Sequence, residues 1–528
     1  MNKRLKLVLF AFLHFSMLSV LFYCSSEARK EAIIPVREEM KSEQEKSPAI
    51  APPPKPTGAA VQDIKRKNNK EESDGKIPDK KKTDSFNSFA ENPFVSTSKE
   101  KFSTFSLKVD TASYSMIRSF VNQGQKPNKD SVRIEEIVNY FPWKYRNDAQ
   151  EKSPIYLHTE MTDCPWNKEN ALLRVVFQTR EIPASEIPPM NLVFLLDVSG
   201  SMSDANKLPL LKKSLRKVID KMRDDDKIAI VVYAAAEGLA LPSTSGKDRD
   251  KILSALNKLE SGGSTNGGAG ITLAYKVAEE NFIKDGVNRI ILGTDGDFNV
   301  GVTGKNLVDM IAKKRETGIY MTLLGLGMGN YKDDTMENIS KEGNGNYFYI
   351  DTEAEADKVF VENFSATLLT VANDTKLQVE FNPQTVISHR LIGYENRMLA
   401  TKDFKDDKKD AGEVGPGHIV TAFYELKLKG KESDFGTVRS RYKIPPSNEV
   451  KEISAKLPRR KAAFEEASPE FHFASGAVAF GLILRDSKFK GKADWKLLKQ
   501  ILSKKPPEYL QSKIGEFKEI TEKAEKLK

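Results

Sequence analysis

Cysteine is almost absent from this chain: only Cys24 and Cys164 occur among its 528 residues. A framework of several disulfides is therefore excluded. If Cys24 serves another purpose, as its surroundings indicate, Cys164 has no partner within the chain. The folded parts must then be held by hydrophobic cores, for which 39% apolar and 9% aromatic residues suffice. The length exceeds that of one core and predicts several domains.

An excess of one charge sign is also missing. The chain has 83 basic and 74 acidic residues, a net charge of +9, and the two signs are interspersed over most of its length. This pattern is typical of solvated surface, whereas nucleic-acid binding needs clustered basic residues. We therefore expect no nucleic-acid partner.

Long hydrophobic runs are limited to Leu7–Tyr23, which follows Lys3, Arg4 and Lys6. A basic start followed by a short apolar stretch predicts a secretory signal over residues 1–24. Its end, "LFYCSS", resembles a bacterial lipobox, in which the cysteine is acylated, although Tyr23 departs from the small residue usual there. We expect an exported protein of the cell envelope, lipid-anchored to a membrane through Cys24 on the periplasmic face or the cell surface. Ordinary cleavage near Ala28 is the alternative.

Apolar residues are scarce from 25 to 91, where Lys, Glu, Pro and Ser dominate. Such a segment cannot bury enough surface to fold, which predicts a disordered tether. Beyond it we expect an α+β flanking region at 92–189, where Asp110 or Thr111 could cap a helix. An α/β domain at 190–372, a β-rich region at 373–457 and a helical region at 458–528 follow. One economical arrangement pairs the strands before Met190 with those after Ala372, so that the α/β domain is inserted between them.

Strands and helices alternate between Met190 and Ala372, which favours a doubly wound, mostly parallel, Rossmann-like sheet with helices on both faces. The strands are "NLVFLLD", "KIAIVVYA", "RIILGTD", "YMTLLGLG" and "NYFYID", with "GLALPSTS" as a possible edge strand. The last helix starts at Glu353 and could extend to Ala372.

Oxygen-bearing side chains gather in the loops of this domain. Asp197, Ser199 and Ser201 follow the first strand in "VFLLDVSGSMSD", Thr265 lies in the glycine-rich "SGGSTNGGAG", and Asp295 ends a later strand in "ILGTDGDFNVG". Ligands of open α/β sheets bind at the carboxyl ends of strands, near the point where strand order reverses. Carboxylates and hydroxyls without His or Cys suit Mg²⁺, or alternatively Ca²⁺ or Mn²⁺, rather than zinc.

This pattern resembles the metal-ion-dependent adhesion site of von Willebrand factor type A domains. The resemblance implies that Ser199, Ser201 and Thr265 supply hydroxyl oxygens and that Asp197 and Asp295 hold the metal directly or through water. It also implies an open coordination position for a partner carboxylate. Segments such as "RIEEIVNYF" and "GHIVTAFYEL" are similar to the bacterial secreted or lipoprotein branch of this family, over about residues 90 to 490.

Other interpretations explain single pieces of the pattern. Ser199 and Ser201 alone could cap the next helix. "DGDFNVG" partly resembles a calcium loop, but Val300 and Asn306 occupy positions that an EF-hand gives to Gly and Glu. A haloacid-dehalogenase-type phosphatase needs a second aspartate where Ser199 stands. A Walker phosphate loop is excluded because no Gly-Lys-Ser/Thr follows the glycines.

Histidine is scarce as well, with five residues scattered outside the α/β domain: His14, His158, His389, His418 and His472. The loop serines therefore lack the partner of a hydrolytic triad, and we expect no enzyme activity. The expected function is metal-dependent capture of a protein partner that offers an Asp or Glu carboxylate. The alternatives are an assembly or chaperone-like scaffold for envelope complexes and, with less support, a metal-dependent phosphatase.

Overall fold

The computed structural model describes residues 84–527 except 109, 146–153, 235–236, 264–266, 297–304, 330, 431–433, 446 and 461–462. All of them fall within one unit, Asp79–Lys528. The predicted signal segment, Cys24, the tether up to 83 and Thr265 lie outside the described residues.

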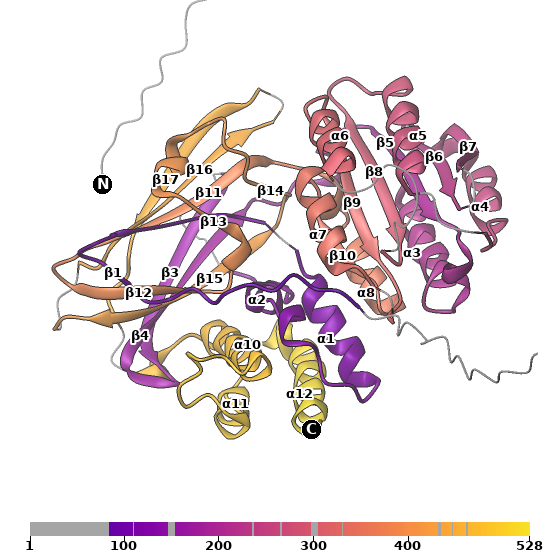
Figure 1. The fold of residues 1–528 in the computed structure, drawn as a ribbon. Coiled ribbons are helices and arrows are strands. Elements are labelled where there is room, and N and C mark those ends of the chain that lie inside the picture. The colour runs from indigo at the N-terminus through magenta and orange to yellow at the C-terminus, as the bar shows by residue number, and fades with distance from the viewer. Residues whose placement is uncertain are drawn as a thin grey trace, which may run out of the picture. The chain divides into compact units, whose positions relative to one another are not determined.

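A six-stranded sheet forms the centre of the α/β domain, in the order β10-β9-β8-β5-β6-β7 (Figure 1). All neighbouring strands are parallel except β7, which pairs antiparallel with β6 at the edge. This arrangement confirms the predicted fold. The strands are β5 (Met190–Asp197), β6 (Lys227–Tyr233), β7 (Glu237–Ser245), β8 (Val287–Thr294), β9 (Ile319–Gly325) and β10 (Tyr347–Tyr349).

Helices cover both faces of this sheet, and β5 is therefore buried along its whole length. Phe194 and Leu196 share a core with α3 on one face, whereas Val193 and Leu195 share a core with α5 on the other. Alternate residues of a strand point to opposite faces, so a continuous apolar run fits a strand that is covered on both. The helices are α3 (Leu208–Lys221), α4 (Arg249–Asn257), α5 (Gly267–Glu280), α6 (Lys305–Arg315), α7 (Asp333–Glu342) and α8 (Glu353–Asp357).

The helix expected from Glu353 to Ala372 is interrupted. After α8 comes a π-helical turn, η5 (Lys358–Glu362), then α9 (Phe364–Leu368), and β11 already begins at Ala372. The Asn363 N–H donates to Lys358 O (3.0 Å), which widens the turn. The Thr367 hydroxyl donates to Val359 O (2.9 Å) and holds α9 against this turn. The prediction of one helix is therefore wrong.

Two further sheets combine strands from before and after the α/β domain. One has the order β1-β12-β15-β4-β3 and the other β13-β2-β11-β16-β17, with β14 paired to β11. The antiparallel pairing of β4 with β15 agrees with the predicted insertion. Leu173 and Val175 of β4 share a core with Leu377 and Val379 of β11. The strands are β1 (Val95–Ser96), β2 (Phe102–Ser106), β3 (Ile155–Cys164), β4 (Asn167–Thr179), β11 (Ala372–Phe381), β12 (Val386–Ile392), β13 (Met398–Leu399), β14 (Gly412–Val414), β15 (Ile419–Leu428), β16 (Gly436–Ile444) and β17 (Glu449–Lys456).

A helical layer rich in aromatic residues packs on the sheet that contains β4 and β15. Its centre is Phe141, Phe473 and Phe517, whose ring centroids are 4.6–5.5 Å apart. The layer confirms the predicted helical C-terminus (Figure 1). No described helix combines the length and the apolar character needed to cross a membrane. The helices are α1 (Ala112–Asn122), α2 (Ile134–Asn139), α10 (Pro469–Arg485), α11 (Trp495–Leu502) and α12 (Gln511–Glu525).

The start of α1 differs from the expected side-chain cap. Thr111 is the N-cap residue, but its side chain makes no capping hydrogen bond. Asp110 is buried, and its carboxylate accepts the Tyr347 N–H (2.9 Å) and pairs with Arg397 (3.1 Å). The aspartate thus connects α1 to the α/β domain instead of capping the helix.

The folded part begins before Asn92, where the tether was expected to end. Asp84 Oδ1 accepts the N–H groups of Gly329 (2.8 Å) and Tyr331 (2.7 Å). Phe86 packs on Phe120, with 6.4 Å between ring centroids. The aromatic residues at the end of the predicted tether therefore supply enough apolar surface to pack this last part of the segment on the folded unit.

Candidate metal centre

The strand order of the α/β sheet reverses between β5 and β8, since β6 lies on one side of this pair and β9 on the other. Asp197 is the last residue of β5, and Asp295 directly follows β8. Ligands of open α/β sheets bind at this kind of switch point. The fold therefore brings together two carboxylates that are far apart in the sequence.

Asp197 is fully buried and accepts hydrogen bonds from the loop that follows β5 and from the end of the neighbouring strand β8. Its Oδ1 accepts the Ser199 N–H (2.9 Å), and its Oδ2 accepts the Thr294 hydroxyl (3.0 Å). Burial, with a smaller contribution from Asp295, raises the pKa of Asp197 to about 6, although the hydrogen bonds from Ser199 and Thr294 oppose the shift. Such a carboxylate is costly when ionised, and a bound cation would offset this cost.

Ser199 and Ser201 lie directly beside each other, with their hydroxyl oxygens 3.1 Å apart. Ser199 precedes the short helix η3 (Gly200–Ser203) without a side-chain cap bond, and α3 begins later, at Leu208. The structure therefore gives no support to the capping interpretation. The two hydroxyls remain available as metal ligands.

The predicted ligand Thr265 lies outside the described residues, but the chain just before it is described. The Gly262 N–H donates to Val198 O (2.7 Å), and the Gly200 N–H donates to Gly263 O (3.0 Å). These bonds attach the glycine-rich loop to the loop that carries Ser199. The position of Thr265 itself remains a prediction.

Lys207 is part of this site and was missed by the sequence analysis. Its ammonium donates to Asp295 Oδ2 (3.0 Å) and to Ser201 O (2.9 Å), and the residue is buried. The available signal was a lysine one position before the helix that follows the serine loop. Thr294, the residue before Asp295 in "ILGTDGDFNVG", was likewise not predicted to have a role in the site.

The described donor atoms fit a hard divalent cation. Asp197, Ser199, Ser201 and Asp295 offer carboxylate and hydroxyl oxygens, and the first, second and last of them are at most 5% exposed. Mg²⁺ prefers such oxygen ligands, completed by water. The α/β domain contains no histidine in its sequence and thus no imidazole for zinc or for a hydrolytic triad.

Three family models match the chain. One described as "von Willebrand factor type A domain" matches residues 191–362, and one described as "von Willebrand factor" matches residues 80–174. A third, "Uncharacterized protein YfbK, C-terminal", matches residues 366–437 and 427–527. The matches thus extend over the α/β domain and both of its flanks.

One curated relative and one solved structure are similar to parts of the chain. "Inter-alpha-trypsin inhibitor heavy chain H3" of Homo sapiens is 26% identical over 268 residues, which are 47% of this chain but only 29% of that relative. A solved structure, "von Willebrand factor type A from Catenulispora acidiphila", is 14% identical, covers 72% of this chain and 91% of its own, and has a TM-score of 0.42.

The most extensive of these similarities is to "Uncharacterized protein YfbK" of Escherichia coli (strain K12). It is 39% identical over 464 residues, which are 83% of this chain and 81% of the relative. Since the similarity covers more than four fifths of both chains, 83% of this one and 81% of the relative, the chain belongs to the YfbK family of proteins with a von Willebrand factor type A domain.

Proposed function

We propose that the α/β domain captures a protein partner through a divalent cation. The cation, Mg²⁺ by preference, is held by Asp197, Ser199, Ser201, Asp295 and Thr265. An Asp or Glu carboxylate of the partner completes its coordination. The observation that carries this proposal is the convergence of the four described motif residues at the switch point between β5 and β8.

The charges of the site support this choice of partner. A divalent cation neutralises the Asp197 and Asp295 carboxylates, and the Lys207 ammonium beside Asp295 adds a further positive charge. The loaded site therefore attracts an additional anion. A protein carboxylate is such an anion and is also a hard ligand of the kind that Mg²⁺ accepts.

Two alternatives make different use of the same domain. A scaffold for envelope complexes would bind partners without needing the metal. A phosphatase would need a carboxylic acid two residues after Asp197, where this chain has Ser199. The absence of histidine from the domain sequence also leaves Ser199 and Ser201 without a general base of that type.

Calorimetric titration of the purified chain with MgCl₂ tests the metal site. We expect one Mg²⁺ to bind and, at about 100 times its Kd, to stabilise the fold by about 2.7 kcal/mol. Asp197→Ala should abolish both effects, whereas the exposed Ser203→Ala should behave like the parent chain. A parent chain that binds no divalent cation would overturn the proposal.

Partner capture is tested separately, by crosslinking on intact cells followed by mass spectrometry with and without EDTA. Partners that depend on the metal should disappear with EDTA and with Asp197→Ala. Capture that is unaffected by either favours the scaffold. Release of phosphate from a generic substrate favours the phosphatase.

The proposed location is the cell envelope, with a lipid on Cys24 as the anchor. Labelled palmitate should enter the parent chain but not Cys24→Ala, which should leave the membrane fraction. A mature N-terminus at Arg29, as expected from ordinary cleavage after Ala28, would contradict the anchor without affecting the metal site.

A further inference from the structure

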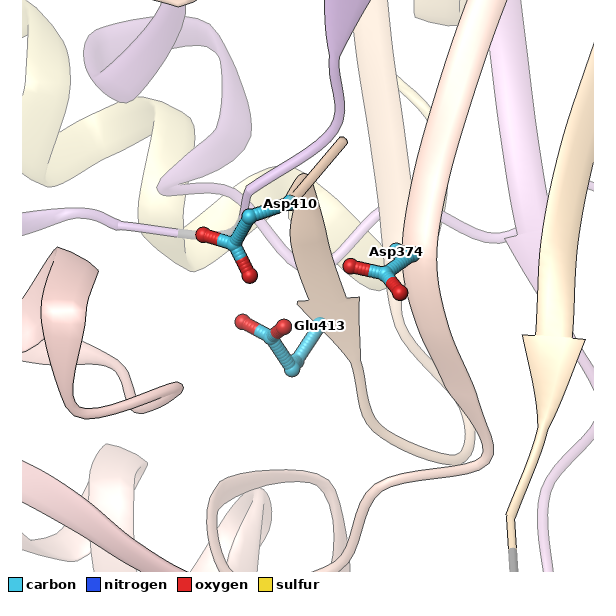
Figure 2. A group of neighbouring side chains, drawn as sticks. All are labelled: Asp374, Asp410 and Glu413. Atoms are coloured by element: carbon cyan, nitrogen blue, oxygen red, sulfur yellow. The ribbon is translucent and has the colours of Figure 1, made fainter. Parts of the chain in front are cut away.

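Three carboxylates gather where the chain leaves the α/β domain (Figure 2). Asp374 lies near the start of β11, Asp410 lies in the loop before β14, and Glu413 lies within β14. Each offers one oxygen, and these atoms all lie within 4.8 Å of one another. The cluster is separate from the Asp197 site and uses none of its residues.

The pairing of β11 with β14 brings these residues together. Ala372 pairs with Val414 and Thr375 with Gly412, and the register shifts between the two pairs. Asp374 lies within this irregularity with a φ of 49°, in the left-handed region that non-glycine residues seldom adopt. Its Oδ1 accepts the Ala411 N–H (3.1 Å), which fixes the carboxylate beside the loop of Asp410.

Two of the three carboxylates have a basic partner. Lys443 donates to Asp374 Oδ2 (2.5 Å), and Arg315 of α6 donates to Asp410 Oδ2 (3.1 Å). The side chains of Asp374 and Asp410 are 18% and 32% exposed, so solvent and small ions can reach the cluster.

Glu413 is the exception. It is only 7% exposed, and its Oε1 has no hydrogen-bond partner among the described residues. The positive charge of Lys108 acts on it, but that ammonium contacts Asp110 (3.2 Å) and Ser340 (2.8 Å). An unpaired buried carboxylate costs several kcal/mol unless it is neutralised.

The neighbours of Asp374 also have oxygen atoms to spare. Asn373 Oδ1 and Thr375 Oγ1 are buried without a hydrogen-bond partner in the described structure. Buried polar atoms are nearly always satisfied by protein, water or an ion. Two polar atoms adjacent to Asp374 in the sequence are thus left without a partner, as Glu413 Oε1 is.

We propose that Asp374, Asp410 and Glu413 bind a divalent cation of the Ca²⁺ class. Ca²⁺ takes oxygen ligands at about 2.3–2.6 Å, so ligands on opposite sides of it are about 4.6–5.2 Å apart. The spacing of the three oxygens fits within this limit. Water reaches the site past the partly exposed aspartates and completes the coordination.

The cation would link the segment that leaves the α/β domain, between α9 and β11, to β14 of the flanking sheets. The Val371 N–H donates to the carbonyl of Val414 (2.9 Å), the residue after Glu413. The last helix of the α/β domain, α9, ends at Leu368, three residues before Val371. Arg315 extends the connection to α6 through Asp410. Calcium therefore stabilises the junction between the α/β domain and β11 without touching the proposed partner site.

The test uses the complete chain with Asp197→Ala, which removes the other metal site, after EDTA treatment and dialysis. Titration with CaCl₂ should show one bound Ca²⁺ and a rise in Tm. Adding Glu413→Gln should weaken Ca²⁺ binding at least tenfold and abolish the Tm rise. Adding Glu342→Gln should change the affinity less than threefold, although Glu342 contacts the same Arg315 (3.5 Å).

A second variant, Asp410→Asn, keeps the test decisive if Glu413→Gln fails to fold, and should lower the affinity in the same way. In EDTA, Glu413→Gln should melt no lower than its parent, because the change removes an unpaired buried charge. No Ca²⁺ binding at millimolar concentration would overturn the proposal and indicate that Glu413 holds a proton. An affinity that is unchanged by Glu413→Gln would also overturn it.

Discussion

Lys207 carries a positive charge into a site that we propose for a divalent cation. Its ammonium contacts Asp295 Oδ2 and Ser201 O, and its stem passes close to Gly327, where a Cβ would lie 2.3 Å from Lys207 Cε. Because like charges repel strongly in a buried environment, the ammonium should weaken metal binding. Lys207→Met keeps most of the stem and should raise Mg²⁺ affinity at least tenfold by calorimetry.

Lys213→Met is the matched control, since Lys213 is exposed and pairs with Glu353 outside the site. It should leave the affinity unchanged. A lower affinity in Lys207→Met would instead mean that Lys207 is needed to orient Asp295 as a ligand.

His418 makes stability depend on pH. Burial lowers its pKa to about 4, and its Nδ1 accepts the Gly415 N–H (3.1 Å), so the folded state holds it neutral. The unfolded chain, with a pKa near 6.5, binds the proton first as the pH falls. Stability is therefore nearly complete above about pH 6.5 and is lost as the pH falls toward 4, by about 3 kcal/mol from this residue.

His418→Asn retains an acceptor for Gly415 but does not titrate in this range. The Tm of the variant should therefore fall less than that of the parent chain between pH 6.5 and 4. Parallel Tm profiles over this range would show that His418 does not contribute.

At the scale of helices and strands, continuous apolar runs and clear alternation were sufficient for prediction. β5 was recognised because it is buried on both faces. β12 and β17 were not predicted. Arg390 of β12 is buried in an ion pair with Glu425 (2.9 Å), which interrupts the apolar pattern, and β17 is a largely exposed edge strand.

The predictability of the two candidate sites differs for a similar reason. Asp197, Ser199 and Ser201 lie at the end of β5 and in the loop after it, and their spacing is visible in the sequence. Asp374 and Asp410 are separated by two strands and meet only because β14 returns to β11. Sequence spacing carries no signal for such a pair.

Gly345, in the turn between α7 and β10, lets the chain pass close to the backbone of β9. A Cβ at this position would lie 1.6 Å from Met321 O, a backbone atom of β9 that cannot move alone. Gly345→Ala should therefore destabilise the chain by about 1–3 kcal/mol, as overpacking of a core does. Thermal unfolding measures the effect.

Gly515 of α12 provides the same substitution in open space, with no atom within 4 Å of its Cβ. Alanine favours a helix over glycine, so Gly515→Ala should stabilise by up to about 1 kcal/mol. Opposite shifts in Tm are expected for the two variants. Equal shifts would contradict the packing argument.

At the scale of the whole described unit, buried ion pairs join the α/β domain to its flanks. Arg118 of α1 contacts Asp351 (2.5 Å) and Glu355 (2.8 Å), and Arg397 contacts Glu337 (3.3 Å). Arg133, just before α2, contacts Asp333 of α7. Replacing one partner of such a buried ion pair lowers the free energy of unfolding, because it leaves the other charge buried and unpaired. The inserted domain should therefore unfold together with its flanks.

Arg133→Met tests this coupling. Arg133 is 3% exposed, and its guanidinium donates to Glu136 (2.5 Å) within α2 and to Asp333 (2.6 Å) across the junction. Removing it leaves two buried carboxylates unpaired and should cost about 3–5 kcal/mol. Lys129→Met is the control, because both side chains of the Lys129–Asp486 pair (3.2 Å) are more than half exposed, so that solvent screens the pair and the Tm should change little. Calorimetry should show one transition for the parent chain and a large downward shift, or a split into two transitions, for Arg133→Met. Two transitions in the parent chain, with the one for the α/β domain unmoved by Arg133→Met, would show that the domain folds independently of its flanks.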